Sequence, residues 1–126
     1  MNEVGFDETI PILRIFSVEK AKEFYLDFLG FTLDWEHRFG DNFPLYMQIS
    51  RGRLRIHLSE HHGDACPGST IFVRMHGIEA LQSELAAKNY RYLRPGVAQV
   101  PWNARMMEIA DPFGNRIRFN EYDPSA

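Results

Sequence analysis

Residues 104–120, ARMMEIADPFGNRIRFN, form the most informative segment of the chain. Ala104 to Ala110 is rich in apolar residues and is typical of a strand. Asp111-Pro112-Phe113-Gly114-Asn115 gathers the residue types that favour turns. Arg116 to Asn120 alternates polar and apolar side chains, as a strand with one buried face does. The segment therefore predicts a strand, a turn and a final strand.

Short segments of the first half of the chain recur in the second half. They are Val18-Glu19 with Ile78-Glu79, Met47-Gln48-Ile49 with Met107-Glu108-Ile109, and Arg53-Leu54-Arg55-Ile56 with Arg116-Ile117-Arg118-Phe119. A repeat of this kind indicates two modules with the same order of elements. Neither module alone covers both faces of its sheet, so the modules must pack together or exchange with those of a partner.

The remaining patterns complete this βαβββ order in both halves. In the first half we expect strands at 9–16, 45–50 and 53–58, an extended segment at 31–39, and a helix from the N-cap Ser17 to Gly30. In the second half we expect strands at 69–75, 104–110 and 116–120, a helix opening at Gly77, and an extended segment at 90–100. The prediction is a single domain, 1–126, with one module at about 9–60, a polar linker at 61–68 and a second module at about 69–122.

Composition limits the classes of function. The chain has 126 residues, of which 44% are hydrophobic, and a net charge of −3 with acids and bases interspersed. This predicts a globular protein that binds neither nucleic acid nor membranes. Cys66 is the only cysteine and the first residues lack the pattern of a signal peptide, so we expect a cytoplasmic protein.

Two motifs carry a family resemblance: Phe24-Tyr25 followed by Leu29-Gly30-Phe31, and the 111–115 turn before the last strand. Over about Ile10 to Glu121 the chain resembles the vicinal-oxygen-chelate superfamily, which includes glyoxalase I, extradiol dioxygenases and fosfomycin- and bleomycin-resistance proteins. The resemblance implies an α+β fold whose two βαβββ modules form cup-shaped curved sheets, completed in a homodimer. It leaves the chemistry open, because these motifs are shared by all the activities of the superfamily.

A narrower resemblance is to the bleomycin-resistance proteins. Leu54 to Pro67 (LRIHLSEHHGDACP), Arg94-Pro95-Gly96-Val97 and Pro101-Trp102 are similar to stretches common in that group. In those proteins a long crevice at the dimer interface holds the planar bithiazole of the drug by aromatic stacking. Bleomycin has a cationic tail, and a net charge of −3 gives it only modest electrostatic attraction.

Metal-dependent members of the superfamily take one His, Gln or Glu ligand from the first and from the last strand of each module. Aligned by their motifs, those positions here hold Ile10, Arg55, Thr70 and Arg118. A guanidinium is always cationic and repels a metal ion, so we expect no metal, no cofactor and no catalytic residue. A register shift of two residues would put His57 at the position of Arg55, but one histidine does not make a site.

His57, His61 and His62 allow a second interpretation. With Glu60 or Asp64 they could bind a metal, or contact a ligand at the rim of the cup. The polar sequence around them favours a solvated loop, because no fixed tetrahedral set of donors is evident.

Strand alternation predicts which side chains face the cup. Leu54, Ile56, Leu58, Ile117 and Phe119 are expected to pack against the helices, which directs Arg55, His57, Arg118 and Asn120 into the cup, where Gln48 and Glu108 could join them. The two arginines could contact a ligand or simply pair with Glu108 and neighbouring carboxylates. The predicted ligand-binding residues are Trp35, Phe39, Tyr46, Arg55, His57, Trp102, Glu108 and Arg118.

The sequence thus predicts a non-catalytic protein that sequesters bleomycin-type glycopeptides in crevices of a homodimer. The sequence gives no sign of nucleophilic catalysis, because no serine lies in a GxSxG elbow and no base can be assigned to Cys66. Two alternatives remain open. One is a metal-dependent glyoxalase- or dioxygenase-type enzyme that binds an ion through His57 with Glu108 or Glu121; the other is a metal-free binder of another small molecule.

Overall fold

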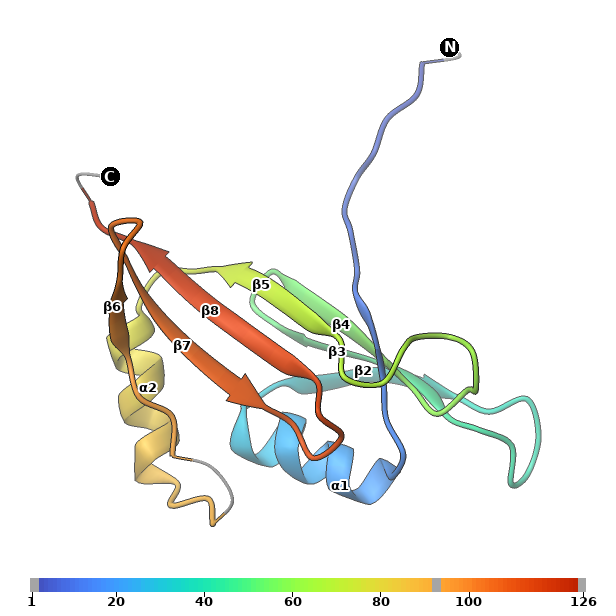
Figure 1. Ribbon diagram of the computed structural model, residues 1–126. Coiled ribbons are helices and arrows are strands. Elements are labelled where there is room, and N and C mark those ends of the chain that lie inside the picture. Colours follow the sequence, from blue (N-terminus) through green and yellow to red (C-terminus); the bar gives the residue numbers. More distant parts are fainter. Residues whose placement is uncertain (1–2, 92–93, 125–126) are drawn as a thin grey trace.

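The computed structural model describes residues 3–91 and 94–124 and contains two four-stranded mixed sheets (Figure 1). The first sheet has the order β1-β4-β3-β2 and the second the order β5-β8-β7-β6. Their strands are β1 (Ile12–Arg14), β2 (Thr32–His37), β3 (Tyr46–Arg51), β4 (Leu54–Ser59), β5 (Thr70–Arg74), β6 (Ala98–Val100), β7 (Ala104–Ala110) and β8 (Arg116–Tyr122). In each sheet the first strand pairs in parallel with the last, and the other pairs are antiparallel. The predicted α+β fold of two βαβββ modules is confirmed.

The first helix begins where the sequence places it. The Ser17 hydroxyl accepts a hydrogen bond from the backbone N–H of Lys20 at 3.2 Å and caps α1 (Val18–Lys22). The helix continues as a π-helical segment, η1 (Glu23–Phe28), which buries the aromatic side chains of Phe24, Tyr25 and Phe28 in the core. Gly30 follows with a φ of +76°, a conformation that favours glycine.

The second helix, α2 (Ile78–Ala87), has an unusual start. Its N-cap is Gly77, which has no side chain to cap the helix. The Glu121 carboxylate of β8 accepts the Ile78 N–H at 2.8 Å instead, and this bond lowers the pKa of Glu121. The last strand therefore anchors the helix of its own module.

The core lies between the sheets and the helices and contains residues of both modules. The five side chains expected to pack toward the helices do so. Ile56, Leu58, Ile117 and Phe119 are buried, and Leu54 packs against the core while partly exposed. The opposite face of each sheet is consequently left to polar and aromatic side chains.

The 111–115 turn joins the modules. Asp111 accepts the backbone N–H groups of Phe113 and Asn115, and its other oxygen accepts the hydroxyl of Tyr25 at 2.7 Å. The Asn115 amide donates to the backbone carbonyl of Arg14 in the other module at 2.7 Å. Burial and the Asp111 carboxylate raise the pKa of Tyr25 well above its ordinary value, so Tyr25 stays protonated and holds the turn on the helix.

Two expected segments are shorter than predicted. The strand expected at 9–16 is limited to β1, and the preceding residues run away from the body as an extended arm on which the Phe6 side chain is 96% exposed (Figure 1). Of the extended segment expected at 90–100, only β6 is a strand, and residues 92–93 lie outside the described residues. Among the described helices, none has the length and apolar character that a membrane span requires.

Candidate functional site

An aromatic cluster lies on the exposed face of the first sheet. We call this the first aromatic face and define it by Trp35, Tyr46, Gln48 and His57. The Trp35 and Tyr46 rings stack with centroids 6.0 Å apart and an angle of 11° between planes. The His57 ring presents its edge to both, at 5.4 Å from Trp35 and 5.1 Å from Tyr46. Such a platform suits a planar ligand.

Hydrogen bonds link the first aromatic face across three strands. His57 Nδ1 is 2.6 Å from the Tyr46 hydroxyl, and His57 Nε2 is 3.0 Å from Gln48 Oε1. Gln48 Nε2 in turn donates to Asp34 at 3.0 Å. Burial lowers the pKa of His57, and burial together with the Asp64 carboxylate raises the pKa of Tyr46. Both groups are therefore neutral at pH 7.

Two further predicted residues lie at the margin of the first aromatic face. The Phe39 ring is 74% exposed and packs edge-on against His37 at 4.7 Å and His61 at 6.0 Å. Arg55 forms an ion pair with Glu8 of the N-terminal arm at 2.8 Å. Arg55 therefore has a carboxylate partner, and this partner is Glu8 rather than Glu108.

The second sheet and the turn before β7 also carry exposed aromatic side chains, Phe72, Trp102 and Tyr122, which we call the second aromatic face. All three side chains are about half exposed, at 50%, 47% and 45%. Trp102 lies in the turn between β6 and β7, and its indole N–H donates to Asn120 at 2.9 Å. Asn120 is fully buried, so it acts as a polar anchor that orients the tryptophan.

Arg118 and Glu108 occupy the same exposed face of the second sheet. They pair directly across β7 and β8, with Arg118 Nε 2.7 Å from Glu108 Oε1. Of the two roles that the sequence left open for Arg118, internal pairing is the one present in the structure.

The strand register corrects one step of the sequence alignment. Gln48 pairs with His57, and Glu108 pairs with Arg118. His57, rather than Arg55, is therefore the repeat counterpart of Arg118. Matching the Arg-x-Arg segments misplaced this position because the two segments lie at different places in their hairpins: Arg55 pairs with Ser50, whereas Arg118 pairs with Glu108, the counterpart of Gln48.

The residues at the superfamily's metal positions do not fit a metal ion. Isoleucine, threonine and arginine supply no suitable donor there, and with the corrected register His57 stands alone. Glu108 lies on the other sheet from His57, and Glu121 caps α2 on the helix side. The described part of the chain contains no group of three His, Cys, Asp or Glu side chains arranged to hold a metal.

The acidic side chains near His61 and His62 are engaged in the local backbone structure. Glu60 accepts the N–H of Leu45 at 3.0 Å, and Asp64 accepts the hydroxyl of Ser59 at 2.6 Å. These contacts shape the linker between the modules and give the histidines no assembled donor set.

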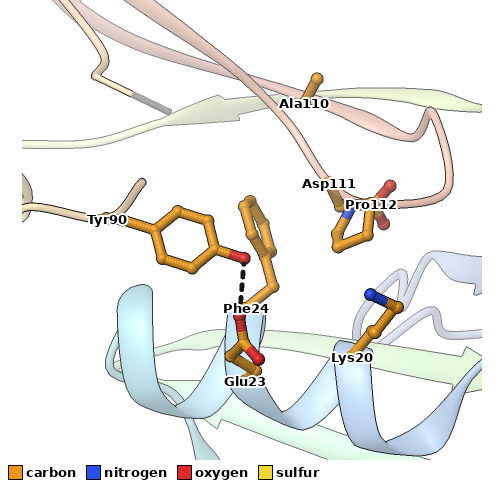
Figure 2. A pocket seen from close by; sticks show the side chains of 7 residues that line it. All are labelled: Lys20, Glu23, Phe24, Tyr90, Ala110, Asp111 and Pro112. Atoms are coloured by element: carbon orange, nitrogen blue, oxygen red, sulfur yellow. Dashed lines mark hydrogen bonds between the residues drawn. The ribbon is translucent and has the colours of Figure 1, made fainter. Parts of the chain in front are cut away.

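Two grooves of the described chain lie away from both aromatic faces. Figure 2 shows one of 480 Å³, where Lys20, Glu23 and Phe24 of the first helix face the Asp111-Pro112 turn, with Tyr90 donating to Glu23 at 3.2 Å. A second, of 670 Å³, lies between the β3–β4 turn and α2. Neither is lined by any of the eight predicted residues.

The structure thus divides the predicted residues between two faces. Trp35, Tyr46 and His57 come together on the first, with Phe39 and Arg55 beside them, while Trp102, Glu108 and Arg118 lie on the second. Sequence reasoning missed Asp34, Phe72 and Tyr122. Alternation could have revealed both: Phe72 stands between Ile71 and Val73, which pack against the core, and Tyr122 continues the outward alternation of Arg116 and Arg118 along β8.

Nearly the whole chain is similar to a known protein family and to several solved structures. The family model described as glyoxalase superfamily protein matches residues 1–125. Among curated proteins, none matches the chain. A bleomycin-binding protein from bleomycin-producing Streptomyces verticillus, solved with copper(II)-bleomycin, is 28% identical and has a TM-score of 0.70; the match covers 96% of this chain and 100% of that one.

Two further solved structures share the fold at lower identity. An antibiotic-binding protein from Streptomyces sp. CB03234 is 21% identical with a TM-score of 0.71, over 96% of this chain and 100% of that one. A bleomycin resistance determinant encoded on the transposon Tn5 is 17% identical with a TM-score of 0.72, over 94% and 99% of the two chains. The chain therefore belongs to the glyoxalase superfamily and has the fold of its bleomycin-resistance proteins.

Proposed function

We propose that the chain is a non-catalytic binding protein that sequesters bleomycin-type glycopeptides in crevices between two copies of itself. The observation that carries the proposal is the pair of exposed aromatic faces, one on each module. Each face offers stacking surfaces and neutral or internally paired polar groups, which suit binding rather than bond cleavage. The copper(II)-bleomycin complex of the Streptomyces verticillus protein supports the choice of ligand.

The need for a second copy follows from the openness of these faces. Trp35 and Trp102 are 44% and 47% exposed and line neither of the two grooves described above. A ligand stacked on one open face keeps its other side in water, whereas drug-sized ligands are buried over most of their surface. Apposition of a second chain would enclose the ligand, and we infer a homodimer on this ground.

Calorimetric titration of copper-loaded bleomycin into chelator-treated protein tests the proposal. We expect saturable binding with one drug per subunit and submicromolar affinity. Trp35→Ala and Trp102→Ala should each weaken binding by at least about fivefold, because an aromatic stacking contact contributes about 1 kcal/mol beyond its buried area.

Phe43→Ala is the matched control, since Phe43 is 54% exposed but belongs to neither aromatic face. Unchanged affinity in both tryptophan variants would show that the ligand binds elsewhere. Absence of heat with the wild-type protein would reject bleomycin and leave the binding of another small molecule to be tested.

A further inference from the structure

Asp34 determines the orientation of the Gln48 amide. The Asp34 carboxylate accepts two hydrogen bonds, one from the Ser50 hydroxyl and one from Gln48, each at 3.0 Å. These bonds lower the pKa of Asp34, so its carboxylate is ionised and accepts hydrogen bonds only. The NH₂ group of Gln48 must therefore face Asp34, which turns the carbonyl oxygen of the amide toward His57.

The orientation of Gln48 determines the tautomer of His57 in turn. An amide oxygen only accepts, so the ring nitrogen that faces it, Nε2, must carry the proton. Nδ1 of the neutral ring then has a lone pair and accepts the hydroxyl proton of Tyr46 over 2.6 Å. With its proton committed to His57, the Tyr46 oxygen has only lone pairs left for any other partner.

We propose that Asp34 is a positioning residue that determines which groups of the first aromatic face donate hydrogen bonds and which accept them. While His57 is neutral, Tyr46 presents an acceptor to a bound molecule. Once His57 is protonated, Tyr46 presents a donor. Protonated His57 donates from both ring nitrogens. The Tyr46 hydroxyl must then accept from Nδ1 and turn its own proton outward. This inference rests on the proposed function only in placing a ligand on this face.

The groups around His57 favour this change of the Tyr46 hydroxyl from acceptor to donor. Its neighbours in the strand register on β1 and β3 are Ile12 and Gln48, neither of which is charged. The charged groups nearby are Arg55, paired with Glu8, and Asp34 beyond Gln48. His61 and Asp64 lie on the Tyr46 side. Among the described residues no carboxylate is hydrogen-bonded to the His57 ring, so the proton added at Nδ1 is donated to the Tyr46 hydroxyl while Nε2 continues to donate to Gln48.

Nitrogen NMR of the histidine rings tests the first half of the proposal without any ligand. At pH 8 the wild-type protein should show His57 with its proton on Nε2. In Asp34→Ala and Asp34→Asn the amide of Gln48 is free to turn, and the Nδ1-protonated form should become populated. Glu36→Gln, on the same strand, is the control and should keep the wild-type tautomer. An Nδ1-protonated wild type, or an unchanged tautomer in both Asp34 variants, would overturn the proposal.

Two planar probes that do not titrate test the second half. Indole offers an N–H donor and coumarin a carbonyl acceptor, and their affinities for the first aromatic face are read from the resonances of Trp35 and Tyr46. Burial lowers the pKa of His57, so the pH is lowered from 8 until nitrogen NMR shows that the His57 ring is protonated. This change should shift the affinity ratio several-fold toward coumarin in the wild type and not in Tyr46→Phe. A constant ratio in the wild type, or absence of both probes from this face, would contradict the proposal. Neither NMR readout depends on bleomycin, so failure of the drug to bind is a separate result.

Discussion

At the scale of the residue, Tyr25 shows how a family motif acts as a structural clamp. Its hydroxyl is fully buried and donates to Asp111, whose other oxygen organises the turn before the last strand. A buried donor that satisfies a buried carboxylate is costly to remove, because the carboxylate is then left with one partner fewer.

Tyr25→Phe is therefore expected to lower the free energy of unfolding by about 1–3 kcal/mol in urea denaturation at pH 7. Tyr122→Phe, which removes a hydroxyl from a ring that is 45% exposed, should have a much smaller effect. Equal losses in the two variants would show that the bond to Asp111 contributes little.

The pKa of Tyr25 adds a test at alkaline pH. Because folding raises this pKa above its ordinary value of 10.0, the folded chain keeps a proton that the unfolded chain releases. The contribution to stability is complete below pH 10 and is lost as the pH rises toward the folded pKa. Wild-type stability should therefore fall more steeply between pH 9.5 and 11 than that of Tyr25→Phe. Parallel pH curves for the two proteins would contradict this assignment.

At the scale of the element, the β3–β4 turn is tied to the helix of the other module. Arg51 donates two hydrogen bonds to Glu84 of α2, both of 2.8 Å, and a third to the carbonyl of Leu29. The bonds from Arg51 lower the pKa of Glu84. A fork of this kind fixes geometry better than a single contact does.

Glu84→Gln should lower the free energy of unfolding by about 0.5–1 kcal/mol at pH 7, a modest value because both side chains are partly exposed. The carboxylate contributes above its ordinary pKa of 4.5 and loses that contribution as the pH falls below it, so the difference from wild type should vanish near pH 3. Glu36→Gln, which removes a single contact to Lys22 within one module, is the control and should change stability less. A difference that persists at pH 3 would rule out an ionic origin.

The elements also show what sequence could and could not predict. Alternation and helical spacing are local, and they located the strands, both helices and the N-cap Ser17. The helical spacing did not reveal that the second half of the first helix, η1, is π-helical. Asp34 reaches the same face as Trp35 because the register shifts between Leu33 and Trp35, and such a bulge arises only when strands pair.

The same reasoning explains the outcome for the site. Trp35 and Tyr46 were predicted as aromatic side chains able to stack on a planar ligand, and His57 because strand alternation directs it into the cup. The counterpart of Arg118 was misassigned because similar Arg-x-Arg segments occupy different positions in the two hairpins, and the pairing of strands, which sets the register, is not visible in the sequence.

At the scale of the whole molecule, the N-terminal arm lies away from the core of its own chain. Val4 and Phe6 are 84% and 96% exposed, and Glu8 meets Arg55 where the arm joins the first sheet. Apolar side chains presented on an extended segment favour association with another surface. We expect a second copy of the chain to cover them.

Sedimentation equilibrium at micromolar concentration should give a dimer for the wild-type chain, and the double variant Val4→Ser with Phe6→Ser should dissociate at least tenfold more readily. Phe43→Ser alters an equally apolar loop residue as the control. A monomeric wild type would remove the shared-crevice arrangement, and an unaffected dimer in the double variant would exclude the arm as part of the interface.

The paired rows Gln48–His57 and Glu108–Arg118 have a consequence for how such a chain diversifies. The same structural position exists twice, and one copy holds an ion pair while the other holds a neutral, hydrogen-bonded ring. Mutations at the Gln48–His57 pair leave the ion pair between Glu108 and Arg118 intact. Because this position exists twice, new binding preferences can be selected at one pair while the other pair keeps its contacts within the sheet.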